Sequence, residues 1–551
     1  MTWLERPLTR RNFLKAAGFA AAAAAAGCAA RPLDLAAIAG RAGAGKKPVV
    51  VIGAGLGGLT AAAYLAKAGY PVTVVEQHSK PGGYATSFDR AAGRFTFEVS
   101  LHQTAAQSGA SRLIFHELGL EDKVEPVKLK NLAHILTPDN DLTLPPADVE
   151  GCVQALAAKF PQEEAGFRSL FNEMVETAED VAALPDRLSA WDYVTFPRKH
   201  KLLWKIRNET LADALARHVK DPRARALSSF LWGYYGLPPS RLSAFYYYIA
   251  TGQYLQGGGY CYRPRSQALS QALVDLIEAH GGRVLLETEV REIIIADRAV
   301  AGARLAGWEA IPAKAVISNA GGPDTFFKML PPEILPAAFR KQLEQYRPSI
   351  SSFVVWLGLN REIQHEFKEY GTFVQDGPLA RDPEAEYQAC LSADAARVGY
   401  AVNIFDNAFP GYSKPGTSTM SIMFVCGYEP FRRFETDYFS GRKAEYLQEK
   451  ERLAGILIER TEKRFIPGLS GMIEVMEIGT PLTNRWYTRN PEGAIYGYEQ
   501  SVGNTFTNRI KNRTPIKGLY LAGAWGAPGG GFTGVQGGGR GAFLDLMEDW
   551  S

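Results

Sequence analysis

Residues 49–83 read VVVIGAGLGGLTAAAYLAKAGYPVTVVEQHSKPGG, and this stretch decides the fold of the 551-residue chain. It opens with an apolar run, Val49–Ile52, that has the length and composition of a buried strand. A glycine turn follows, and then a helical pattern over residues 56–68 that Gly69 ends. Residues 72–76 are again apolar up to a closing glutamate. The order strand, turn, helix, strand predicts a βαβ unit, and therefore an α/β fold built on a parallel sheet.

The glycine turn of this unit, GAGLGG over residues 53–58, satisfies the GxGxxG pattern of dinucleotide-binding loops. Glycine there permits the tight turn out of the strand, the approach of backbone to a pyrophosphate, and close packing of helix on strand. Glu76 ends the second strand, where its carboxylate can accept hydrogen bonds from a ribose diol and disfavours a 2′-phosphate. The sequence therefore predicts a dinucleotide other than NADP, held by Gly53, Gly55, Gly57, Gly58 and Glu76.

Four segments together resemble the superfamily of phytoene desaturases, carotenoid isomerases and all-trans-retinol saturases. They are EQHSKPGG at residues 76–83, FEVSLH at residues 97–102, and two longer stretches over residues 479–500 and 518–541. The resemblance implies FAD as the cofactor. It also implies an α/β fold in which a Rossmann-type FAD-binding domain, of the flavin amine oxidase and phytoene desaturase type, is interleaved with an α+β substrate domain.

The resemblance also assigns residues to the cofactor. The backbone of Val290 is expected to contact the adenine, and the glycine-rich residues 518–541 are expected to lie against the isoalloxazine, with a helix N-terminus facing its O2 side. Many related flavoproteins carry an acidic residue where Ala524 stands, so no carboxylate is assigned to the ribityl chain. The additional residues implied are Gly82, Gly83, Val290, Gly523, Ala524, Gly530, Gly531 and Val535.

The chain is longer than a single core supports, because cores stop growing at roughly 250 to 300 residues. The patterns and the resemblance divide it into segments that alternate between the two expected domains. They are a signal peptide (1–30), a linker (31–47), the FAD-binding domain in three parts (48–125, 263–330 and 490–551) and the substrate domain in two parts (126–262 and 331–489).

The N-terminal segment resembles a bacterial twin-arginine export signal. Arg10 and Arg11 are followed by Phe13, by Leu14 and then by an alanine-rich run over residues 16–26. This run is too short and too weakly apolar to remain as a membrane-spanning helix. The segment therefore predicts export through the twin-arginine translocon to the periplasm or cell envelope.

Cys28 follows Ala25-Ala26-Gly27, which resembles a lipoprotein cleavage box, and both lipidation of this cysteine and plain cleavage are left open. One acyl chain would hold the protein only loosely, as a peripheral membrane protein. The other cysteines form no CxxC and no Cys/His cluster, so no metal site is predicted. They are expected to be buried as small apolar side chains: Cys152, Cys261, Cys390 and Cys426.

The segment from Leu113 to Tyr262 is mostly helical in composition, and its last part, residues 230–262, is rich in tyrosine and phenylalanine. An aromatic, apolar tunnel suits a polyene or another long apolar lipid, and ordinary core packing accounts for such a stretch equally well. His102 is a candidate acid or polar contact near the flavin, with a structural histidine as the alternative. No other catalytic residue is assigned.

No second GxGxxG follows a strand, so no NAD(P)H site is predicted. Electrons are expected to pass to or from a quinone or another membrane-soluble carrier, or to return to the flavin in a redox-neutral isomerisation. The expected function is an exported FAD-dependent oxidoreductase that desaturates, saturates or isomerises carbon–carbon double bonds of a carotenoid, retinoid or other long apolar lipid.

Two other functions stay open. One is a flavin amine oxidase, which shares the expected fold, and the other is a flavin-bearing protein that binds lipid without turnover. Nucleic acid is set aside as a partner, because a formal net charge of +3 over the whole chain gives no electrostatic reason to bind it.

Overall fold

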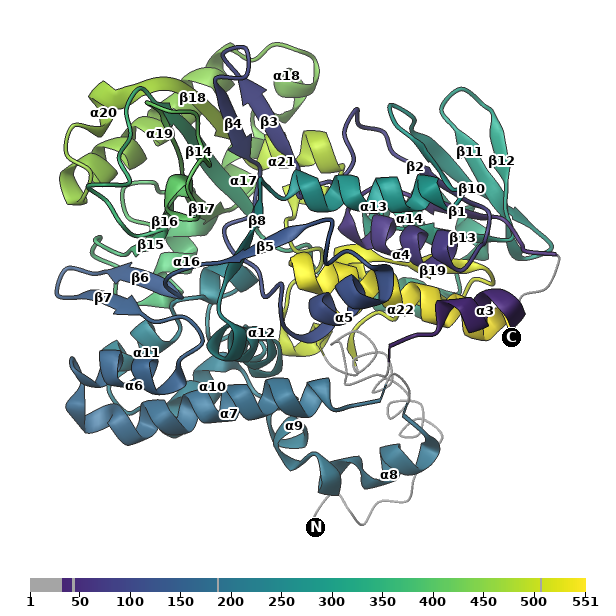
Figure 1. The fold of residues 1–551 in the computed structure, drawn as a ribbon, viewed down its shortest axis with the longest axis horizontal. Coiled ribbons are helices and arrows are strands. Elements are labelled where there is room, and N and C mark those ends of the chain that lie inside the picture. The colour runs from purple at the N-terminus through teal and green to yellow at the C-terminus, as the bar shows by residue number, and fades with distance from the viewer. Residues whose placement is uncertain (1–31, 42–44, 186–187, 506–507) are drawn as a thin grey trace.

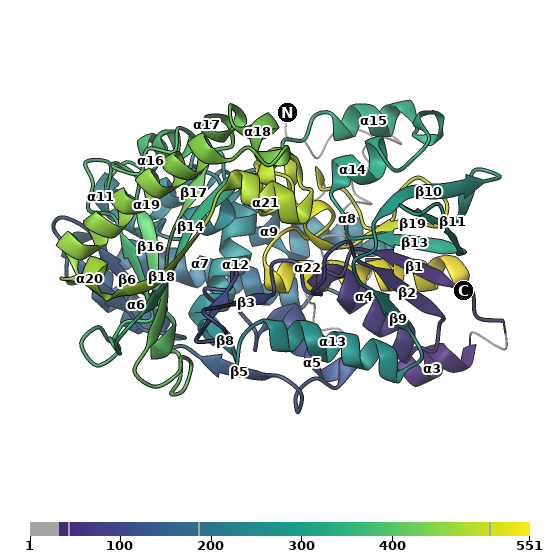
Figure 2. The same ribbon diagram turned by 90° about the horizontal axis from the view of Figure 1, so that it is seen from above.

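The computed structural model describes residues 32–41, 45–185, 188–505 and 508–551. Figures 1 and 2 show two lobes, one around a parallel sheet and one around a larger mixed sheet flanked by helices. The segment with the arginine pair and Cys28 lies outside the described residues. Within the described ranges, no helix is long and apolar enough to cross a bilayer, and no group of three or more ligating side chains could hold a metal ion.

A five-stranded parallel sheet forms the centre of the first lobe, in the order β19-β13-β1-β2-β9. Alternate residues of β1 face opposite layers, because side chains along a strand point to opposite faces. Val49 and Val51 pack on the helical layer, whereas Val50 and Ile52 pack toward a small antiparallel sheet. The strands are β1 Val49–Ile52, β2 Val72–Val75, β9 Arg283–Leu285, β13 Ala315–Ser318 and β19 Leu519–Leu521, and those of the small sheet are β10 Val290–Ala296, β11 Ala299–Leu305 and β12 Ala310–Pro312.

The helical layer of this lobe joins the two ends of the chain. Helix α4, Leu56–Lys67, packs against α22, Phe532–Trp550, and against α13, Gln267–Ala279. Helix α5, Gly109–Leu118, lies on the other side of α22. Figure 1 shows the yellow C-terminal helix alongside the purple α4, so the last segment of the chain completes a layer that the first segment begins.

The predicted βαβ unit is confirmed, with β1, α4 and β2 ending within one residue of the predicted limits. The predicted fold class is confirmed as well, since helices cover a parallel sheet in the first lobe and a mixed sheet with its own helices forms the second. Three other segments differ from the sequence predictions.

First, the glycine-rich residues expected at the flavin include the start of the last helix, which begins at Phe532, because its glycines permit close packing on α4. Second, residues 31–47 showed no periodicity, yet Leu35–Arg41 form helix α3, in which Leu35 is buried against the first lobe. Third, the largely helical stretch before Tyr262 also contains strands: β5 Glu125–Lys128, β6 Ala133–Leu136, β7 Asp141–Leu144 and β8 Tyr260–Arg263.

A seven-stranded sheet forms the second lobe, in the order β18-β14-β17-β16-β15-β6-β7. All its pairs are antiparallel except β15 with β6, which come from distant parts of the chain. Its remaining strands are β14 Ser351–Leu359, β15 Gly371–Val374, β16 Tyr400–Ile404, β17 Ser418–Cys426 and β18 Ile473–Gly479. A short hairpin, β3 Ser87–Arg90 with β4 Phe95–Glu98, lies near this sheet.

Helices surround the larger sheet and fill the space between the lobes. Helix α12, Ala244–Gly257, packs along the long helix α7, Glu164–Ala182. The others are α6 Val149–Ala157, α8 Ala190–Lys199, α9 Lys201–Ile206, α10 Leu211–His218, α11 Pro222–Ser228, α16 Pro383–Leu391, α17 Glu429–Arg432, α18 Glu435–Phe439, α19 Ala444–Arg464, α20 Leu469–Met472 and α21 Pro481–Thr488. Two more helices, α14 Gly322–Phe327 and α15 Ala337–Leu343, pack instead on the first lobe, on the side of its small antiparallel sheet.

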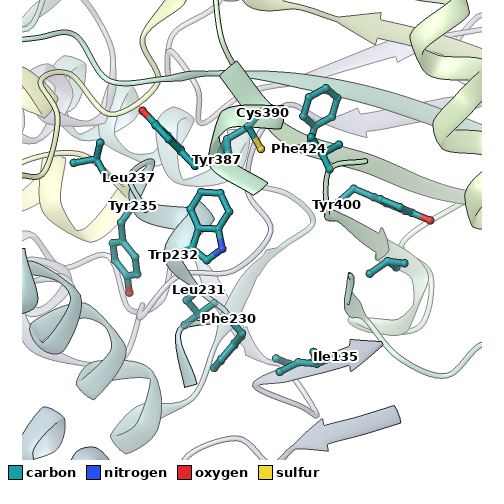
Figure 3. Close-up of a cluster of buried hydrophobic side chains, with 14 of the residues drawn as sticks. Ile135, Phe230, Leu231, Trp232, Tyr235, Leu237, Tyr387, Cys390, Tyr400 and Phe424 are labelled. Carbon is teal, nitrogen blue, oxygen red and sulfur yellow. The ribbon is translucent and has the colours of Figure 1, made fainter. Parts of the chain in front are cut away.

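The core of the second lobe is aromatic. Figure 3 shows Trp232 and its neighbours packed toward α16 and the sheet, and the Trp232 ring meets the edge of Tyr387 with 6.1 Å between ring centroids. Cys390 and Cys426 are buried and unpaired in this lobe. Cys152 and Cys261 are also buried and unpaired, so the prediction for the four cysteines is confirmed.

One fully buried ion pair fastens the C-terminal helix to the first lobe. Arg540 of α22 donates to both carboxylate oxygens of Glu117 in α5, at 2.8 and 2.9 Å. The side chains are 1% and 0% exposed. Tyr64 of α4 and the backbone N–H of Leu33 donate to the same carboxylate. Helices α4, α5 and α22 and the segment before α3 therefore meet at Glu117. A buried carboxylate satisfied in this way is costly to leave without its cation.

Replacement of Arg540 by Met is expected to lower the free energy of unfolding by about 3 to 5 kcal/mol, because Glu117 would remain buried without its cation. Urea denaturation of wild type and variant measures the loss. The control is Arg442→Gln, which removes an exposed pair with Asp437 and should cost about 0 to 1 kcal/mol. Equal losses in the two variants would contradict a special role for the buried pair.

Candidate cofactor and substrate site

A cavity of about 890 Å³ runs between the two lobes. One part is lined by the glycine turn after β1, the end of β2 and the start of α22, and the other part is lined by α12 and strands of the larger sheet. The cavity has the size of a cofactor pocket. The sequence-predicted residues that line it are Gly53, Gly55, Gly57, Glu76, Gly82, Gly83, His102, Val290, Gly523, Ala524, Gly530, Gly531 and Val535.

The turn after β1 can be built only from glycine at several positions. Gly53 has φ of +90°, which side chains rarely adopt. A Cβ on Gly57 would lie 2.6 Å from the backbone nitrogen of Gly523, in the C-terminal segment. Gly58 does not line the cavity, and a Cβ there would lie 2.2 Å from the carbonyl oxygen of Gly53. Gly58 therefore serves the packing of helix on strand, while its neighbours leave backbone bare toward the cavity.

Glu76 stands at the end of β2 and points its carboxylate toward the same turn. The backbone N–H of Ala54 donates to its Oε2 at 2.7 Å, and the backbone N–H of His78 donates to its Oε1 at 2.9 Å. These bonds fix the carboxylate at the cavity wall, and each oxygen keeps a lone pair for a further donor. A ribose diol is a donor of that kind, so the arrangement fits the adenosine half of a dinucleotide.

The C-terminal segment closes the cavity opposite this turn. A Cβ on Gly523 would lie 2.3 Å from Oδ1 of Asn319, which follows β13. Gly531 precedes α22 and offers no side-chain cap, so the first N–H groups of that helix are open toward the cavity. Flat glycine backbone beside an uncapped helix N-terminus fits a planar ring with partly negative oxygens.

Arg509 is a cavity residue that the sequence patterns did not indicate. Its guanidinium donates to the carbonyl oxygens of Gly526, Asn504 and Ala524 and to Oε1 of Gln500, at 2.6 to 3.2 Å. None of the described carboxylates pairs with it. Burial lowers the pKa of this guanidinium to about 10, so it keeps its charge at neutral pH. The cavity wall therefore holds a positive charge beside Ala524, the position at which many related flavoproteins carry an acidic residue.

The far part of the cavity is lined by one face of α12. The lining residues recur every four positions along this helix, whereas the opposite face packs on α7, where a Cβ on Gly252 would lie 2.3 Å from the carbonyl oxygen of Met174. Both faces are therefore covered, which explains why the aromatic run does not alternate with polar residues. The lining face consists of Phe245, Tyr246, Ile249, Ala250, Gln253 and Tyr254.

The tyrosines of this part are neutral hydrogen-bond donors. Tyr246 donates to the carbonyl oxygen of Gly530 at 3.0 Å, and Tyr254 donates to that of Gln103 at 3.2 Å. Burial raises the pKa of both hydroxyl groups above the usual value. The Tyr246 contact joins α12 to the glycine-rich C-terminal segment, so the apolar part and the nucleotide part of the cavity share a wall.

His102 lies in the cavity wall beside these aromatic residues. Its ring centroid is 6.3 Å from that of Tyr234, and Tyr370 donates to its carbonyl oxygen at 2.6 Å. Burial lowers the pKa of the imidazole to about 4, so the ring is neutral at pH 7. In that state it can donate or accept one hydrogen bond at each nitrogen, but it is not a store of positive charge.

Comparison with known proteins extends over most of the chain. A family model described as flavin containing amine oxidoreductase matches residues 56–542. The all-trans-retinol 13,14-reductase of Danio rerio is 26% identical over 510 residues, which cover 86% of this chain and 82% of that protein. The phytoene desaturase (lycopene-forming) of Pseudescherichia vulneris is 26% identical over 518 residues, which cover 91% of this chain and 99% of that protein.

The fold is also similar to that of a solved enzyme. Cyclohexylamine oxidase from Brevibacterium oxydans superposes with a TM-score of 0.59 at 17% identity, and the match covers 92% of this chain and 99% of that one. The match spans both lobes, so this chain shares the overall fold of that oxidase.

Replacement of Gly57 by Ala is expected to weaken FAD binding by about 10- to 100-fold, because the new methyl group would collide with the backbone of Gly523 and force the two walls apart. Visible flavin absorbance per mole of purified protein, followed by titration with FAD, measures the loss. Gly455→Ala is the matched control, because a Cβ at this position of α19 meets open space. Full flavin content in Gly57→Ala would contradict the assigned contact.

The buried imidazole of His102 is expected to make stability depend on pH. Its pKa is lowered to about 4 in the folded protein, so its contribution is complete above the unfolded value of about 6.5 and is lost as pH falls toward 4. Between about pH 7.5 and pH 5 the wild type should lose about 2 kcal/mol more unfolding free energy than His102→Gln. Denaturation at both pH values measures the difference.

The control for this comparison is His280→Gln, which replaces an exposed histidine at the end of α13 and should follow the wild type at both pH values. A His102→Gln variant with the same pH dependence as the wild type would show that this imidazole titrates normally in the folded protein.

Proposed function

The chain belongs to the family of flavin containing amine oxidoreductases and is an FAD-dependent oxidoreductase, and from that premise we propose that it acts on carbon–carbon double bonds of a long apolar polyene. The observation that carries the proposal is the lining face of α12, which presents aromatic and aliphatic side chains to the cavity without a charged group. Such a wall suits a substrate that has few polar atoms. The relatives named for retinol reduction and phytoene desaturation support the same substrate class.

In this proposal the residues at the glycine-rich end hold the cofactor. Glu76 accepts from the ribose, the turn over residues 53–58 faces the pyrophosphate, and Val290 lies at the adenine. Gly523, Gly530 and their neighbours cover the flavin. When bound, FAD supplies the hydride chemistry, and the protein supplies position and exclusion of water. The remaining cavity residues then hold the polyene beside it, with Tyr246 and neutral His102 as the polar groups nearest to the reacting carbons.

The proposal includes an electron carrier and a location. We propose a quinone or another membrane-soluble carrier as the electron carrier. Among the described residues one parallel sheet carries a GxGxxG turn after its first strand, and that turn is assigned to FAD, so no second sheet offers such a turn to NAD(P)H. Export rests on Arg10, Arg11 and the alanine-rich run that follows them. An isomerisation would need no net electron transfer, and the same cavity serves desaturation, saturation and isomerisation.

A larger side chain in the apolar part of the cavity is expected to slow polyene turnover without loss of the cofactor. Ala250→Trp adds an indole to the lining face of α12 and should lower kcat/KM for a carotenoid or retinoid by at least about tenfold. Ala250→Ser, which leaves the size nearly unchanged, is the matched control. Product analysis by mass and absorbance, with flavin content measured in parallel, gives the result.

The same preparation distinguishes the alternatives. Anaerobic addition of polyene to the oxidised or reduced wild type should change flavin absorbance or yield an isomer. Amine-dependent peroxide release without polyene conversion would establish an amine oxidase instead. Bound polyene with unchanged flavin and unchanged polyene would establish a carrier.

A further inference from the structure

Helices α8 and α9 form a protruding basic arm, which we define as residues 190–207. Figure 1 shows α8 at the lower edge of the molecule, beyond the long helix α7. The arm contains five cationic residues and one acidic residue, Asp192, so its formal charge is 5 − 1 = +4. The whole chain carries only +3, and the rest of the molecule is therefore slightly acidic. The cations are Arg198, Lys199, Lys201, Lys205 and Arg207.

The outer face of α8 combines apolar and basic side chains. Trp191 is 68% exposed and Val194 is 60% exposed. Arg198 follows on the same face at the spacing i, i+3, i+7, and it is also exposed. The opposite face carries Phe196, which is buried. A helix that exposes an indole and an aliphatic group beside cations has the composition of an interfacial membrane helix.

A capping box and contacts with α7 fix the arm to the body of the protein. A capping box between Ser189 and Asp192 fixes the start of α8. At its end, His200 hydrogen-bonds to Asp180 of α7 at 3.2 Å, and its ring lies 4.7 Å from that of Phe196. The exposure of Trp191 is therefore a property of a fixed helix.

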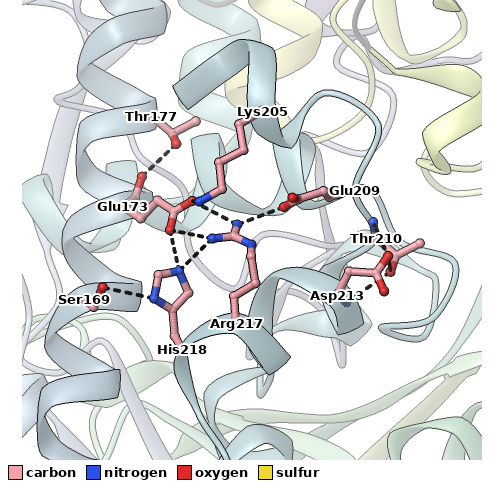
Figure 4. Close-up of polar contacts among 9 residues, drawn as sticks. All are labelled: Ser169, Glu173, Thr177, Lys205, Glu209, Thr210, Asp213, Arg217 and His218. Carbon is pink, nitrogen blue, oxygen red and sulfur yellow. Dashed lines mark hydrogen bonds and ion pairs between the residues drawn. The ribbon is translucent and has the colours of Figure 1, made fainter. Parts of the chain in front are cut away.

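Helix α9 is fixed to α7 by a polar network around Glu173, which Figure 4 shows. Lys205 of the arm lies 3.3 Å from the Glu173 carboxylate, Arg217 donates to both of its oxygens, and His218 completes the set. Burial raises the pKa of Glu173, but the hydrogen bonds from His218 and Arg217 outweigh it and lower the pKa to about 2. Glu173 therefore stays ionised at neutral pH, and its contacts hold the arm against the body.

Among the described residues, two other tryptophans are exposed, in different surroundings. Trp308 is 73% exposed at the turn between β11 and β12, next to Glu309. Trp486 is 44% exposed and has Lys443 and Arg489 over its ring, at 5.9 and 5.8 Å. A single exposed indole is ordinary for a protein surface. Trp486 lies on α21 beside exposed Tyr487, so that surface also joins aromatic and basic side chains, but there the cations lie over the indole ring itself.

We propose that the basic arm docks the protein on an anionic lipid surface, with Trp191 and Val194 in the headgroup region and with Arg198 and Lys201 at the lipid phosphates. Tryptophan prefers the membrane interface, because its ring is apolar and its N–H is polar. Lysine and arginine place their apolar stems along the interface and their charges at the headgroups. The surface charge favours anionic over neutral lipid. The docking site does not depend on the substrate proposed above.

The test uses purified flavin-loaded full-length protein and sedimentation with vesicles. One set of vesicles is phosphatidylcholine alone, and the other is an equimolar mixture with phosphatidylglycerol. We expect binding to the mixed vesicles that falls with added salt. Arg198→Gln with Lys201→Gln should weaken this binding by about 30-fold, since each cation near the surface contributes about 1 kcal/mol. Trp191→Ala should weaken it by roughly tenfold.

Matched variants remove the same residue types elsewhere. Lys341→Gln with Lys368→Gln removes two exposed lysines outside the arm, and Trp308→Ala removes the most exposed of the three tryptophans compared above. Both should bind as the wild type. All variants should keep their flavin absorbance, because neither the arm nor the control positions line the cavity.

Three outcomes would overturn the proposal. Arm variants that bind mixed vesicles like the wild type would place the membrane contact elsewhere, including the first 31 residues. Equal binding to neutral and mixed vesicles would remove the role of charge. Retention on a soluble polyanion that the arm variants lose, without any vesicle binding, would identify an acidic macromolecule as the partner instead of lipid. None of these outcomes bears on the proposed enzymatic activity, because polyene turnover is measured separately in detergent.

Discussion

The cavity depends on a backbone contact between the two ends of the chain that only glycine permits. Gly57 at the start of α4 approaches Gly523 so closely that a methyl group on Gly57 would lie 2.6 Å from the backbone nitrogen of Gly523. Gly539 in the middle of α22 repeats the constraint, because a Cβ there would lie 2.3 Å from the carbonyl oxygen of Gly57. The first βαβ unit and the last helix therefore form one surface, and the cavity is the space that this surface leaves beside the second lobe.

The charged groups near this surface lie at two depths, one behind the helices and one at the cavity wall. The pair between Glu117 and Arg540 lies behind the helices, is fully buried, and neutralises itself. Arg509 lies at the cavity wall and is compensated only by carbonyl and amide oxygens. A buried cation of this kind favours negative charge in the space beside it. The N-terminus of α22 acts in the same direction, because its open N–H groups carry partial positive charge. The cavity therefore has a positive end at the C-terminal segment and an uncharged aromatic wall along α12.

The sequence predicted local features well and long-range features poorly, for physical reasons. The unit from β1 to β2 was predicted nearly to the residue, because hydrophobic period, glycine turn and closing glutamate agree with one another. The start of α22 was missed, because glycine lowers helix propensity and its packing on α4 is visible only in three dimensions. Arg509 stands in no motif, so its place at the cavity wall could not be predicted. The face of α12, Ala244–Gly257, that lines the cavity could not be predicted, because a helix covered on both faces shows no amphipathic period.

The second lobe connects the cavity to the outer surface through packed helices. Helix α12 lines the cavity with one face and rests on α7 with the other, and α7 holds α9 through the Glu173 network. The basic arm is therefore connected to the apolar wall through helices that pack directly on one another. A substrate with few polar atoms partitions into lipid rather than water, so an enzyme that takes such a substrate gains from a fixed orientation on a bilayer. In the proposed docking, the packing of α9 on α7 and of α7 on α12 would orient the apolar wall relative to the bilayer.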